Sequence, residues 1–492
     1  MKTVYNLLKS LNSHLITPES KIVIHSQDES ISYQSLNFKV NLAAKHLRKS
    51  GIAPGDLVAI LSDNSPDFVV SILALWMIEA IPVPINIKLS ASEFEEQLKI
   101  LECKFVLAEY SLKEKISFAG INKININLLY LTSDSFDVDF RYNETRTAII
   151  MFTSGSSGKP KAVELSFSNL ISSASIGNEY LKQTKEDRWL ASLPFYHIGG
   201  FSIIFRSLMF GTEIILPNNL KLQSIIQSIN QLKPTLISLV SSQMSELLKN
   251  NIHPNDELRH VLLGGGFIDS NLMREALHKG WNVSRVYGST ETSSFVTVLS
   301  PDEFKVKPES VGKPIPPNEI IIYDENRNEL PNNIEGEIAI KSSTVMKRYF
   351  NSEAETKNKL VNGVYFTGDI GYKDSEGYIH VVNRRSDLIV TGGENVNPAE
   401  VEEMILQFPK VKEVCVFGID DSKWGQKIAA AIVANSNAKF SGEDLKDFLK
   451  DKIASFKIPK KIYFVDEFPK TELGKIKRES LKKLFVRNNF NM

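Results

Sequence analysis

Residues 147–161 read Thr-Ala-Ile-Ile-Met-Phe-Thr-Ser-Gly-Ser-Ser-Gly-Lys-Pro-Lys, an apolar strand pattern that runs into a turn rich in glycine and hydroxyl groups. Gly155 and Gly158 allow positive φ and a close approach of the backbone to a ligand. Successive backbone N–H groups in such a turn form a concave anion site. We therefore expect this turn to bind polyphosphate, with help from the hydroxyl and ammonium groups of Thr153, Ser154, Ser156, Ser157, Lys159 and Lys161.

The spacing of the two glycines separates this turn from the Walker A loop. That loop places four residues between its glycines and a hydroxyl residue after its lysine. Here Ser156 and Ser157 alone separate the glycines, and Pro160 follows Lys159. A kinase or ATPase of the P-loop type is therefore disfavoured. A solvent-exposed Ser/Gly loop without a ligand stays open as an alternative.

The composition is typical of a globular protein with more than one domain. The chain has 492 residues, of which 42% are hydrophobic and 24% charged. Lys+Arg and Asp+Glu both number 58, so the charge balance gives no indication of a nucleic-acid partner. Cys103 and Cys415 are the only cysteines, which excludes a disulfide framework and suits a cytoplasmic location. The chain shows neither a signal-peptide pattern nor an uninterrupted membrane-spanning stretch, so we expect no membrane span.

Strand-like and helix-like segments alternate from about residue 20 to 300. This alternation predicts an α/β fold with parallel-rich sheets covered by helices. Short strands with Gly, Asn and Asp turns follow, which predicts a small β-barrel, and a compact α+β pattern begins near Pro398. We therefore expect a large N-terminal domain over residues 1–384 and a small C-terminal domain over residues 385–492.

Several short polar motifs follow the predicted strands, where ligands of open α/β sheets bind. His197 lies before two glycines and could line a pocket, although a structural histidine is an equal alternative. Gly264, Gly265 and Gly266 follow the predicted strand His260–Leu263 and would let a flat ligand lie against the backbone, unless they form a simple strand-to-helix turn.

The motif Tyr287-Gly288-Ser289-Thr290-Glu291 follows another predicted strand. Tyr287 offers an aromatic face to a base, and Thr290 a hydroxyl to a phosphoryl oxygen. Glu291 is the acid of this motif, and Mg²⁺ on a nucleotide takes one or two carboxylates besides the phosphates. A solvated acid at a strand end is the alternative.

Three further motifs lie in the last third of the chain. Asp369 is expected just after a short strand, where it could accept hydrogen bonds from both hydroxyls of a ribose. Arg384 could bind phosphate or ribose, or form a surface ion pair. Gly392 and Gly393 lie close to the domain boundary. Lys475 opens a basic helix and, taken alone, is a solvated cation.

Taken in this order, the motifs resemble those of the adenylate-forming superfamily, which includes the acyl-CoA synthetases. The resemblance extends from about Ser32 to Arg478. Within the superfamily the chain is most similar to the o-succinylbenzoate–CoA ligases of menaquinone biosynthesis. Three features carry this narrower likeness: a chain that is compact for the superfamily, Gly264–Gly266, where many relatives carry Gly-Gly-Ala, and the stretch Thr292–Pro301.

The resemblance implies an AMP-forming ligase with two half-reactions. A carboxylic acid attacks the α-phosphate of ATP and releases pyrophosphate, and the thiol of coenzyme A then displaces AMP. ATP, Mg²⁺ and coenzyme A are the implied cofactor and co-substrates. The implied nucleotide contacts are Thr153–Lys161 for the β- and γ-phosphates, Gly264–Gly266 and Tyr287 at the adenine, Thr290 at the α-phosphate, Glu291 at the metal, Asp369 and Arg384 at the ribose, with Val381 packed nearby. Gly288 and Ser289 are further implied nucleotide contacts.

The resemblance also implies a mobile C-terminal lid. Lys475 would bridge the carboxylate and the α-phosphate during adenylation, which stabilises developing charge. A hinge in the segment Arg384–Asp387, with Ser386 as the expected position, would then withdraw Lys475. The loop that contains Gly392 and Gly393 would help to shape the thiol tunnel.

The acid expected from the narrower resemblance is o-succinylbenzoate, whose ring carboxylate needs donors in the pocket. His197 would border that pocket, and Ser202, Arg206, Ser293 and Ser294 are the candidate donors. A fatty or aryl acyl-CoA ligase, an enzyme that loads a carrier protein, and a nucleotide-binding regulator without activity are the alternatives. A homodimer is a further expectation.

Overall fold

The computed structural model describes most of the chain, and its contacts group it into two units. The residues described are 20–26, 29–116, 120–130, 143–154, 160–266, 268–383, 388–421, 423–435 and 440–469, together with residues 481 and 485. Unit 1 consists of Met1–Ile87, Leu98–Thr153 and Ala162–Asn383. Unit 2 consists of Lys88–Gln97, Ser154–Lys161 and Arg384–Met492. Each unit is considered by itself below.

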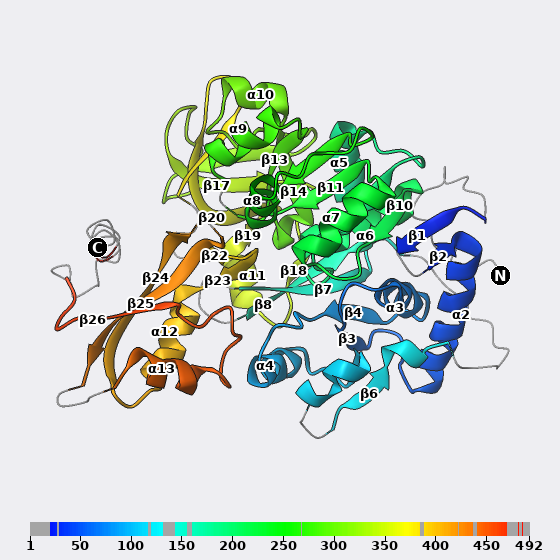
Figure 1. Ribbon diagram of the computed structural model, residues 1–492, viewed down its shortest axis with the longest axis horizontal. Helices are drawn as coiled ribbons and strands as arrows, with labels where there is room; N and C mark the ends of the chain where they lie inside the picture. Colours follow the sequence, from blue (N-terminus) through cyan, green and yellow to red (C-terminus); the bar gives the residue numbers. More distant parts are fainter. Residues whose placement is uncertain are drawn as a thin grey trace. The chain divides into compact units, whose positions relative to one another are not determined.

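The largest element of unit 1 is a sheet with nine strands in the described part of the chain (Figure 1). In spatial order these are β15 (Lys313–Pro314), β14 (Ser294–Leu299), β13 (Val283–Ser289), β12 (His260–Leu263), β11 (Leu236–Leu239), β9 (Arg188–Leu190), β10 (Glu213–Leu216), β1 (Ile22–Ser26) and β2 (Ser30–Ser32). Neighbouring strands from β13 to β1 are parallel, and the strands at both edges are antiparallel. The predicted parallel-rich α/β architecture is confirmed.

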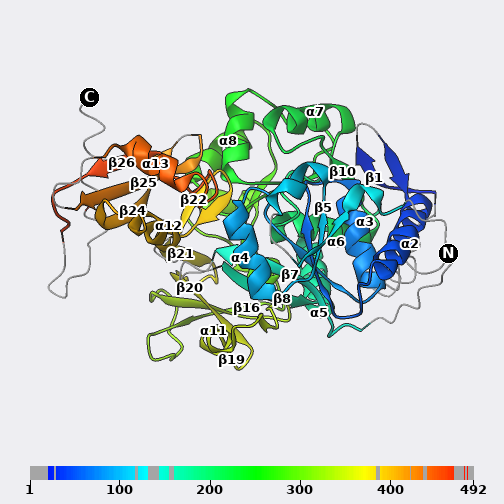
Figure 2. The same ribbon diagram turned by 90° about the horizontal axis from the view of Figure 1, so that it is seen from below.

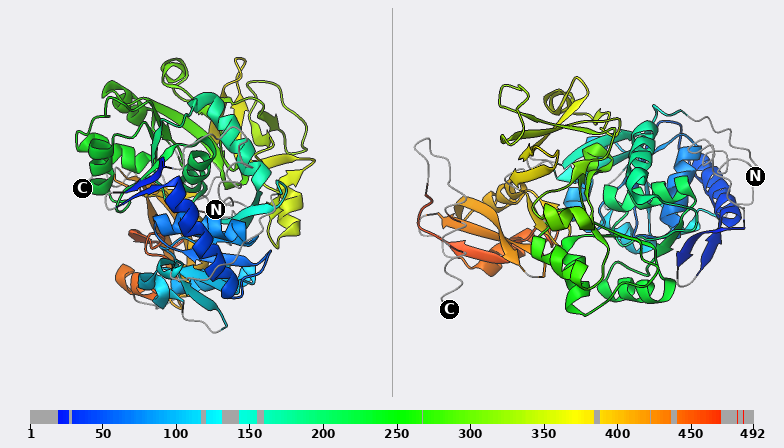
Figure 3. Two further views of the ribbon diagram at one scale, coloured as in Figure 1. Left: turned by 90° about the vertical axis from the view of Figure 1, so that its right-hand side faces the viewer. Right: turned by 90° about the horizontal axis from the view of Figure 1, so that it is seen from above.

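Helices cover both faces of this sheet because its strands are apolar on both sides. Leu190 and Trp189 are neighbours in β9 and point into different clusters, as the period of two in a strand requires. Leu190 joins the cluster under α7 (Leu222–Leu232), α8 (Ser241–Lys249) and α9 (Ser270–His278). Trp189 joins the cluster that contains α5 (Phe167–Leu181) and α6 (Ile198–Phe210). Figures 2 and 3 show these helix layers from other directions.

A second sheet of unit 1 is entirely parallel among the described residues. Its order is β4 (Ile81–Pro84), β3 (Leu57–Leu61), β5 (Phe105–Ala108) and β6 (Asn122–Asn125). Helix α3 (Pro66–Met77) begins at the cap Ser65, whose side chain accepts a hydrogen bond from the Phe68 N–H. From Phe68 to Met77 every residue of the helix is buried, so this part is enclosed on all sides. Trp76 donates its ring N–H to the Ala148 carbonyl at 2.7 Å.

Two smaller sheets complete unit 1 in the part of the chain that the structure describes. One has the order β18 (Arg348–Tyr349), β8 (Pro160–Ser166) and β7 (Thr147–Ser154). The residues expected to form a small barrel give a five-stranded antiparallel sheet of β16 (Glu319–Tyr323), β17 (Gly336–Lys341), β20 (Val364–Lys373), β19 (Leu360–Val361) and β21 (Ile379–Asn383). The remaining helices with their bounds are α2 (Tyr33–Lys49), α4 (Ala91–Leu101), α10 (Pro301–Val306), α11 (Glu353–Lys359), η1 (Tyr110–Lys115) and η2 (Ile126–Leu128).

Unit 2 is built on a sheet with α12 (Pro398–Leu406) and α13 (Gly442–Leu449) on one face. Its strands are β23 (Glu394–Val396), β22 (Ile389–Thr391), β25 (Gly425–Ala434), β24 (Val411–Asp421) and β26 (Lys461–Phe464). Lys457 is 7% exposed and pairs with Glu93 at 2.6 Å and with Glu400. These ion pairs join segments of unit 2 that are far apart in sequence.

The helices in the described ranges include none with the length and apolar composition needed to cross a membrane.

Candidate functional site

Three of the motifs predicted from the sequence gather at one edge of the large sheet in unit 1. Because β9, β12 and β13 are parallel, the residues that follow them lie at the same, carboxyl edge. His197 follows β9, Gly264–Gly266 follow β12, and Tyr287–Glu291 span the end of β13 and the start of the short 3₁₀ helix that follows it. Parallel strands therefore bring together motifs that are separated by up to 94 residues of sequence, from 197 to 291.

The end of β13 joins two of the predicted nucleotide contacts. The Tyr287 hydroxyl donates a hydrogen bond to Asp369 Oδ2 at 2.7 Å, so the predicted adenine and ribose residues are neighbours. Gly288 lies between them and the returning strand β14, where a Cβ would stand 2.1 Å from the Ser294 carbonyl oxygen. No larger residue fits at this position without displacing backbone.

The environment of Asp369 differs from the one expected. Asp369 was predicted just after a short strand, but it lies within the ten-residue strand β20. The pairing of β20 with its neighbours shifts register around this residue. This irregularity aims the side chain at Tyr287 although the strand continues. Likewise Tyr287, Gly288 and Ser289 end the strand β13 and do not follow it.

Glu291 lies in the short 3₁₀ helix η3 (Thr290–Thr292) and is 3% exposed. Its Oε1 accepts a hydrogen bond from the Tyr349 hydroxyl at 2.8 Å, and its carbonyl accepts one from the Met346 N–H at 2.8 Å. The described residues contain no cluster of three or more metal-ligating side chains. A single fixed carboxylate suits Mg²⁺ that takes most of its ligands from the phosphates of a nucleotide.

Two hydroxyl groups among the predicted nucleotide contacts have no hydrogen-bond partner among the described residues. They are Thr153 Oγ1, at the end of β7, and Ser289 Oγ, at the end of β13, and both atoms are buried. Buried polar atoms are normally paired, so an unpaired one calls for a ligand or water. Lys161 is buried in β8. The predicted contacts Gly155, Ser156, Ser157, Gly158 and Lys159, and the side chain of Ser154, lie outside the described residues.

The buried carboxylate of Glu164, in β8, is paired with two exposed cations. Its carboxylate binds Lys347 at 2.8 Å and Arg348 at 2.7 Å, and it accepts a hydrogen bond from Thr147. Burial opposes ionisation of this group, but the bonds from Lys347, Thr147 and Arg348 outweigh it and lower the pKa of Glu164 below its usual value. Glu164 is therefore ionised at neutral pH and fastens β8 to β18.

Arg206 is a fully buried cation without an acid partner in the described part of the chain. Its Nη2 donates to the Ser173 carbonyl and hydroxyl at 3.3 and 3.2 Å, and its guanidinium lies 4.3 Å from the centre of the Phe295 ring. Burial lowers the pKa of Arg206 from its usual value to about 9, which still leaves it charged at neutral pH. A carboxylate brought by a ligand would balance this charge.

The other candidate donors for the acid are close to Arg206 in the fold. Ser202 precedes Arg206 by one helical turn on α6 and is therefore on the same face of the helix. Ser173, the partner of Arg206, donates to the Ser293 carbonyl at 2.7 Å. Ser293 and Ser294 have positive φ of 54° and 111°, and Ser294 is a strained residue of the kind that clusters at functional sites.

His197 is half-buried and occupies the N-cap position of α6. Gly200 in the first turn of this helix packs directly on the preceding loop, where a Cβ would be 2.1 Å from the Pro194 carbonyl oxygen. Asn64 also binds this loop. Its side chain accepts a hydrogen bond from the Phe195 N–H and donates one to the Leu193 carbonyl, both at 2.8 Å. The loop that carries His197 is thus fixed from two sides.

The glycine triplet forms the turn between β12 and α9. Gly265 has a φ of 83°, and a Cβ on Gly264 would be 2.8 Å from a methyl group of Val286. The triplet therefore lies against β13, just before Tyr287, as a binding surface for a flat ring requires.

The remaining predicted residues are placed less completely. Val381 lies in β21 and packs on the main core cluster. Gly392 and Gly393 have φ of 59° and 84° and form the two-residue turn between β22 and β23 in unit 2. Arg384 and Lys475 lie outside the described residues, as does the hinge segment 384–387.

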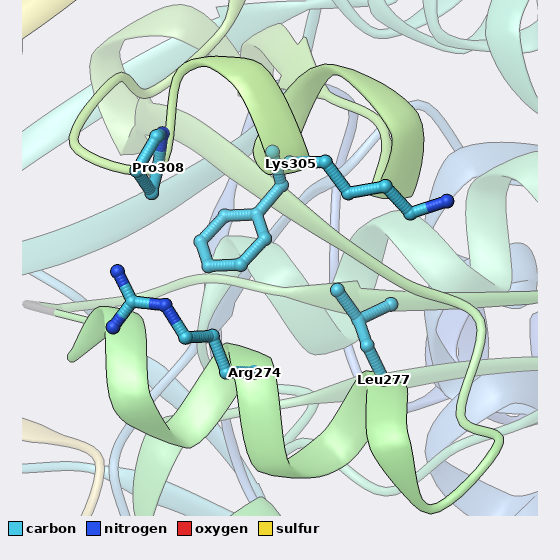
Figure 4. A pocket seen from close by; sticks show the side chains of 5 residues that line it. Arg274, Leu277, Lys305 and Pro308 are labelled. Carbon is cyan, nitrogen blue, oxygen red and sulfur yellow. The ribbon is translucent and has the colours of Figure 1, made fainter.

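A surface hollow in unit 1 is separate from this site. It lies between α9 and α10, has a volume of about 340 Å³, and is lined by Arg274, Leu277, Phe304, Lys305 and Pro308 (Figure 4). None of these residues belongs to a predicted motif, so the hollow has no part in the chemistry described here.

Sequence reasoning missed three residues that fix the site: Tyr349, Glu164 and Asn64. Tyr349 is in the stretch Met346–Phe350, which contains neither a glycine turn nor an acid. Its contact with Glu291 joins residues 58 positions apart. Such a contact depends on the packed fold and has no local signal in one sequence.

Comparison with known proteins gives two family matches. Residues 16–350 match the family described as AMP-binding enzyme, and residues 400–475 match the AMP-binding enzyme C-terminal domain. The 2-succinylbenzoate–CoA ligase of Bacillus subtilis is 35% identical over 468 residues, which cover 95% of this chain and 96% of that protein.

Solved structures give the same result. The o-succinylbenzoate CoA synthetase of Bacillus subtilis, as a double mutant bound to the product analogue OSB-NCoA, is similar with a TM-score of 0.91 and 34% identity; the match covers 97% of this chain and 98% of that one. The same enzyme in complex with ATP and magnesium ion matches with a TM-score of 0.75 and 33% identity, over 98% and 99% of the two chains.

Proposed function

This chain belongs to the family of AMP-binding enzymes, and we propose that it is an ATP-dependent ligase that joins o-succinylbenzoate to coenzyme A. The predicted resemblance to adenylate-forming enzymes, and within them to o-succinylbenzoate–CoA ligases, is confirmed by relatives that match over nearly the whole chain. In the first half-reaction the acid attacks the α-phosphate of ATP and pyrophosphate leaves. In the second the thiol of coenzyme A attacks the acyl-adenylate and AMP leaves.

The described residues support specific roles on the nucleotide side. Tyr287 and Gly264–Gly266 would enclose the adenine, and Asp369, held by Tyr287, would accept the ribose hydroxyls. Thr153, Ser289 and Thr290 would donate hydroxyl groups to phosphate oxygens, which suits the unpaired hydroxyls of the first two. Glu291 would hold Mg²⁺, which when bound to the triphosphate neutralises part of its charge.

The second unit would supply the remaining groups, a proposal that rests on the resemblance. Lys475 would stabilise the charge that develops between the carboxylate and the α-phosphate, and Arg384 would bind the ribose. A hinge in 384–387 would then let Gly392 and Gly393 approach the thiol. A cytoplasmic location and a homodimer stay predictions.

The observation that carries the choice of acid is the buried, acid-free Arg206. A monocarboxylate of a fatty-acid type would react at its own carboxyl group and leave this charge uncompensated. An acid with a second carboxylate can place one group at the reaction centre and the other at Arg206. o-Succinylbenzoate is such an acid, since its succinyl carboxylate reacts and its ring carboxylate stays charged.

A thioester assay against a matched panel of acids tests this proposal. The panel contains o-succinylbenzoate, 3-benzoylpropionate, which lacks only the ring carboxylate, and hexanoate and 4-coumarate. We expect kcat/KM for o-succinylbenzoate to exceed that for 3-benzoylpropionate on the order of 100-fold, because one charge-assisted contact is lost.

Better use of hexanoate or 4-coumarate would assign the enzyme to the fatty or aryl acyl-CoA ligases. Pyrophosphate release that depends on o-succinylbenzoate, with no thioester formed, would indicate a carrier protein as the acceptor. The absence of any acid-dependent pyrophosphate release would indicate a nucleotide-binding regulator.

A further inference from the structure

One short segment of unit 1 contacts both Glu291 and the strand β8. We call residues 346–350 the brace; they include β18. On one side the brace holds Glu291 through two hydrogen bonds of 2.8 Å, from the Met346 N–H to the main chain and from the Tyr349 hydroxyl to the carboxylate. The backbone and the side chain of Glu291 are therefore fixed by two residues, Met346 and Tyr349, that are three positions apart in sequence.

On the other side the brace holds β8, one of the two strands that flank the glycine- and hydroxyl-rich turn. Lys347 and Arg348 bind the buried carboxylate of Glu164 at 2.8 and 2.7 Å. The main chain adds hydrogen bonds from Lys347 N–H to the Glu164 carbonyl at 3.0 Å and from Phe350 N–H to the Ala162 carbonyl at 2.7 Å. Side chains alternate along β18, so Arg348 faces Glu164 while Tyr349 faces Glu291.

We propose that Tyr349 is a positioning residue for Glu291, and that the brace fixes this carboxylate relative to strand β8. This proposal rests on the proposed function, in which Glu291 binds the metal. A carboxylate ligand needs an outer partner that fixes its orientation, and removal of such a partner commonly lowers metal affinity 10- to 100-fold. Tyr349 is 1% exposed, so its hydroxyl has little access to bulk water as a substitute partner.

A purely structural role for Tyr349 makes a different prediction. As a core aromatic with one satisfied hydroxyl, it would affect the stability of unit 1 and every ligand alike. A positioning role affects the part of nucleotide binding that depends on Mg²⁺. The two roles can therefore be separated by measuring ATP binding with and without the metal.

The experiment uses the full chain with Tyr349→Phe, which keeps the ring and removes only the hydroxyl. Tyr180→Phe is the matched control: its hydroxyl bonds Ser284 Oγ at 2.6 Å, at the opposite end of β13 from Glu291. The Kd of ATP is measured by isothermal titration calorimetry with excess Mg²⁺ and with EDTA, and thermal unfolding is recorded for each variant. Glu291→Gln serves as the reference for loss of the metal ligand.

We expect Tyr349→Phe to raise the Kd of ATP in Mg²⁺ on the order of tenfold and to leave the Kd in EDTA unchanged within about twofold. Tyr180→Phe should leave both values as in the wild type. Glu291→Gln should remove most of the difference between Mg²⁺ and EDTA.

Two results would overturn the proposal, and they are distinguishable. If Glu291→Gln removes the Mg²⁺ dependence but Tyr349→Phe behaves like Tyr180→Phe, or shifts both Kd values equally, Tyr349 has no positioning role and the metal assignment stands. If Glu291→Gln retains the wild-type Mg²⁺ dependence, the metal assignment and the role of the brace fail together.

Discussion

A guanidinium buried without an acid destabilises the protein until a ligand supplies the missing charge. This is the position of Arg206, whose partners among the described residues are the neutral Ser173 and the ring of Phe295. We expect Arg206→Met to raise the free energy of unfolding of the acid-free protein by about 1 kcal/mol or more, because replacing a buried charge by an apolar group is often stabilising. The same change should lower kcat/KM for o-succinylbenzoate on the order of 100-fold and leave that for 3-benzoylpropionate within about threefold.

Chemical denaturation and the thioester assay measure the two effects separately. Arg206→Lys is the control, since it keeps the charge and loses the planar fork, and its kcat/KM should lie between those of the wild type and Arg206→Met. An equal loss of activity towards both acids would mean that Arg206 supports the fold and does not recognise the ring carboxylate.

For single residues, the sequence predicted which side chains belong to the site better than it predicted which side chains contact one another. Tyr287 and Asp369 were each expected to contact the nucleotide, and their mutual hydrogen bond emerged only in the fold. Tyr349 has no local signal, because its role depends on the register of β18 against β8. Residue type and local spacing indicate the chemistry of a side chain. They do not indicate which residues distant in sequence will contact one another.

Elements with a regular pattern were predicted closely. The strand His260–Leu263 has the predicted bounds, because its apolar pattern is a local property. The prediction that the strand ends before Asp369 was wrong. Strand β20 continues to Lys373 through a shift in its pairing register with β17.

The start of α6 gives a test at the level of one element. Gly199 and Gly200 are adjacent, but a Cβ on Gly200 would be 2.1 Å from the backbone oxygen of Pro194, whereas one on Gly199 would be 3.2 Å from a methyl group of Leu193. We expect Gly200→Ala to lower the free energy of unfolding by about 2 kcal/mol or more, since backbone cannot yield as a side chain can. It should also raise KM for the acid, because His197 caps this turn.

Gly199→Ala is the matched control for this element. Its free energy of unfolding should stay within about 1 kcal/mol of the wild type, because alanine favours a helix and the leucine side chain can move. Both quantities are available from urea denaturation and steady-state kinetics. Equal stability of the two variants would show that the loop before α6 is not fixed as described.

In the whole molecule, one chain carries out two half-reactions that are proposed to need different residues. Lys475, which lies outside the described residues, is proposed to act in adenylation alone. Lys475→Ala should therefore abolish acid-dependent ATP–pyrophosphate exchange, while thioester formation from supplied acyl-adenylate should stay within about tenfold of the wild type. The two reactions are assayed separately on the same preparation. Equal loss of both would contradict a role that is confined to the first step.

Unit 2 is assembled from three stretches of chain, and this affects the design of chimeric enzymes. A single crossover at residues 383 and 384 would transplant Lys457 and Glu400 but leave Glu93 with the recipient. The graft would then contain a buried ammonium with half of its counter-charge, which is a strongly destabilising arrangement. Recombination between relatives should therefore move residues 88–97 together with the C-terminal segment, as a single inherited block.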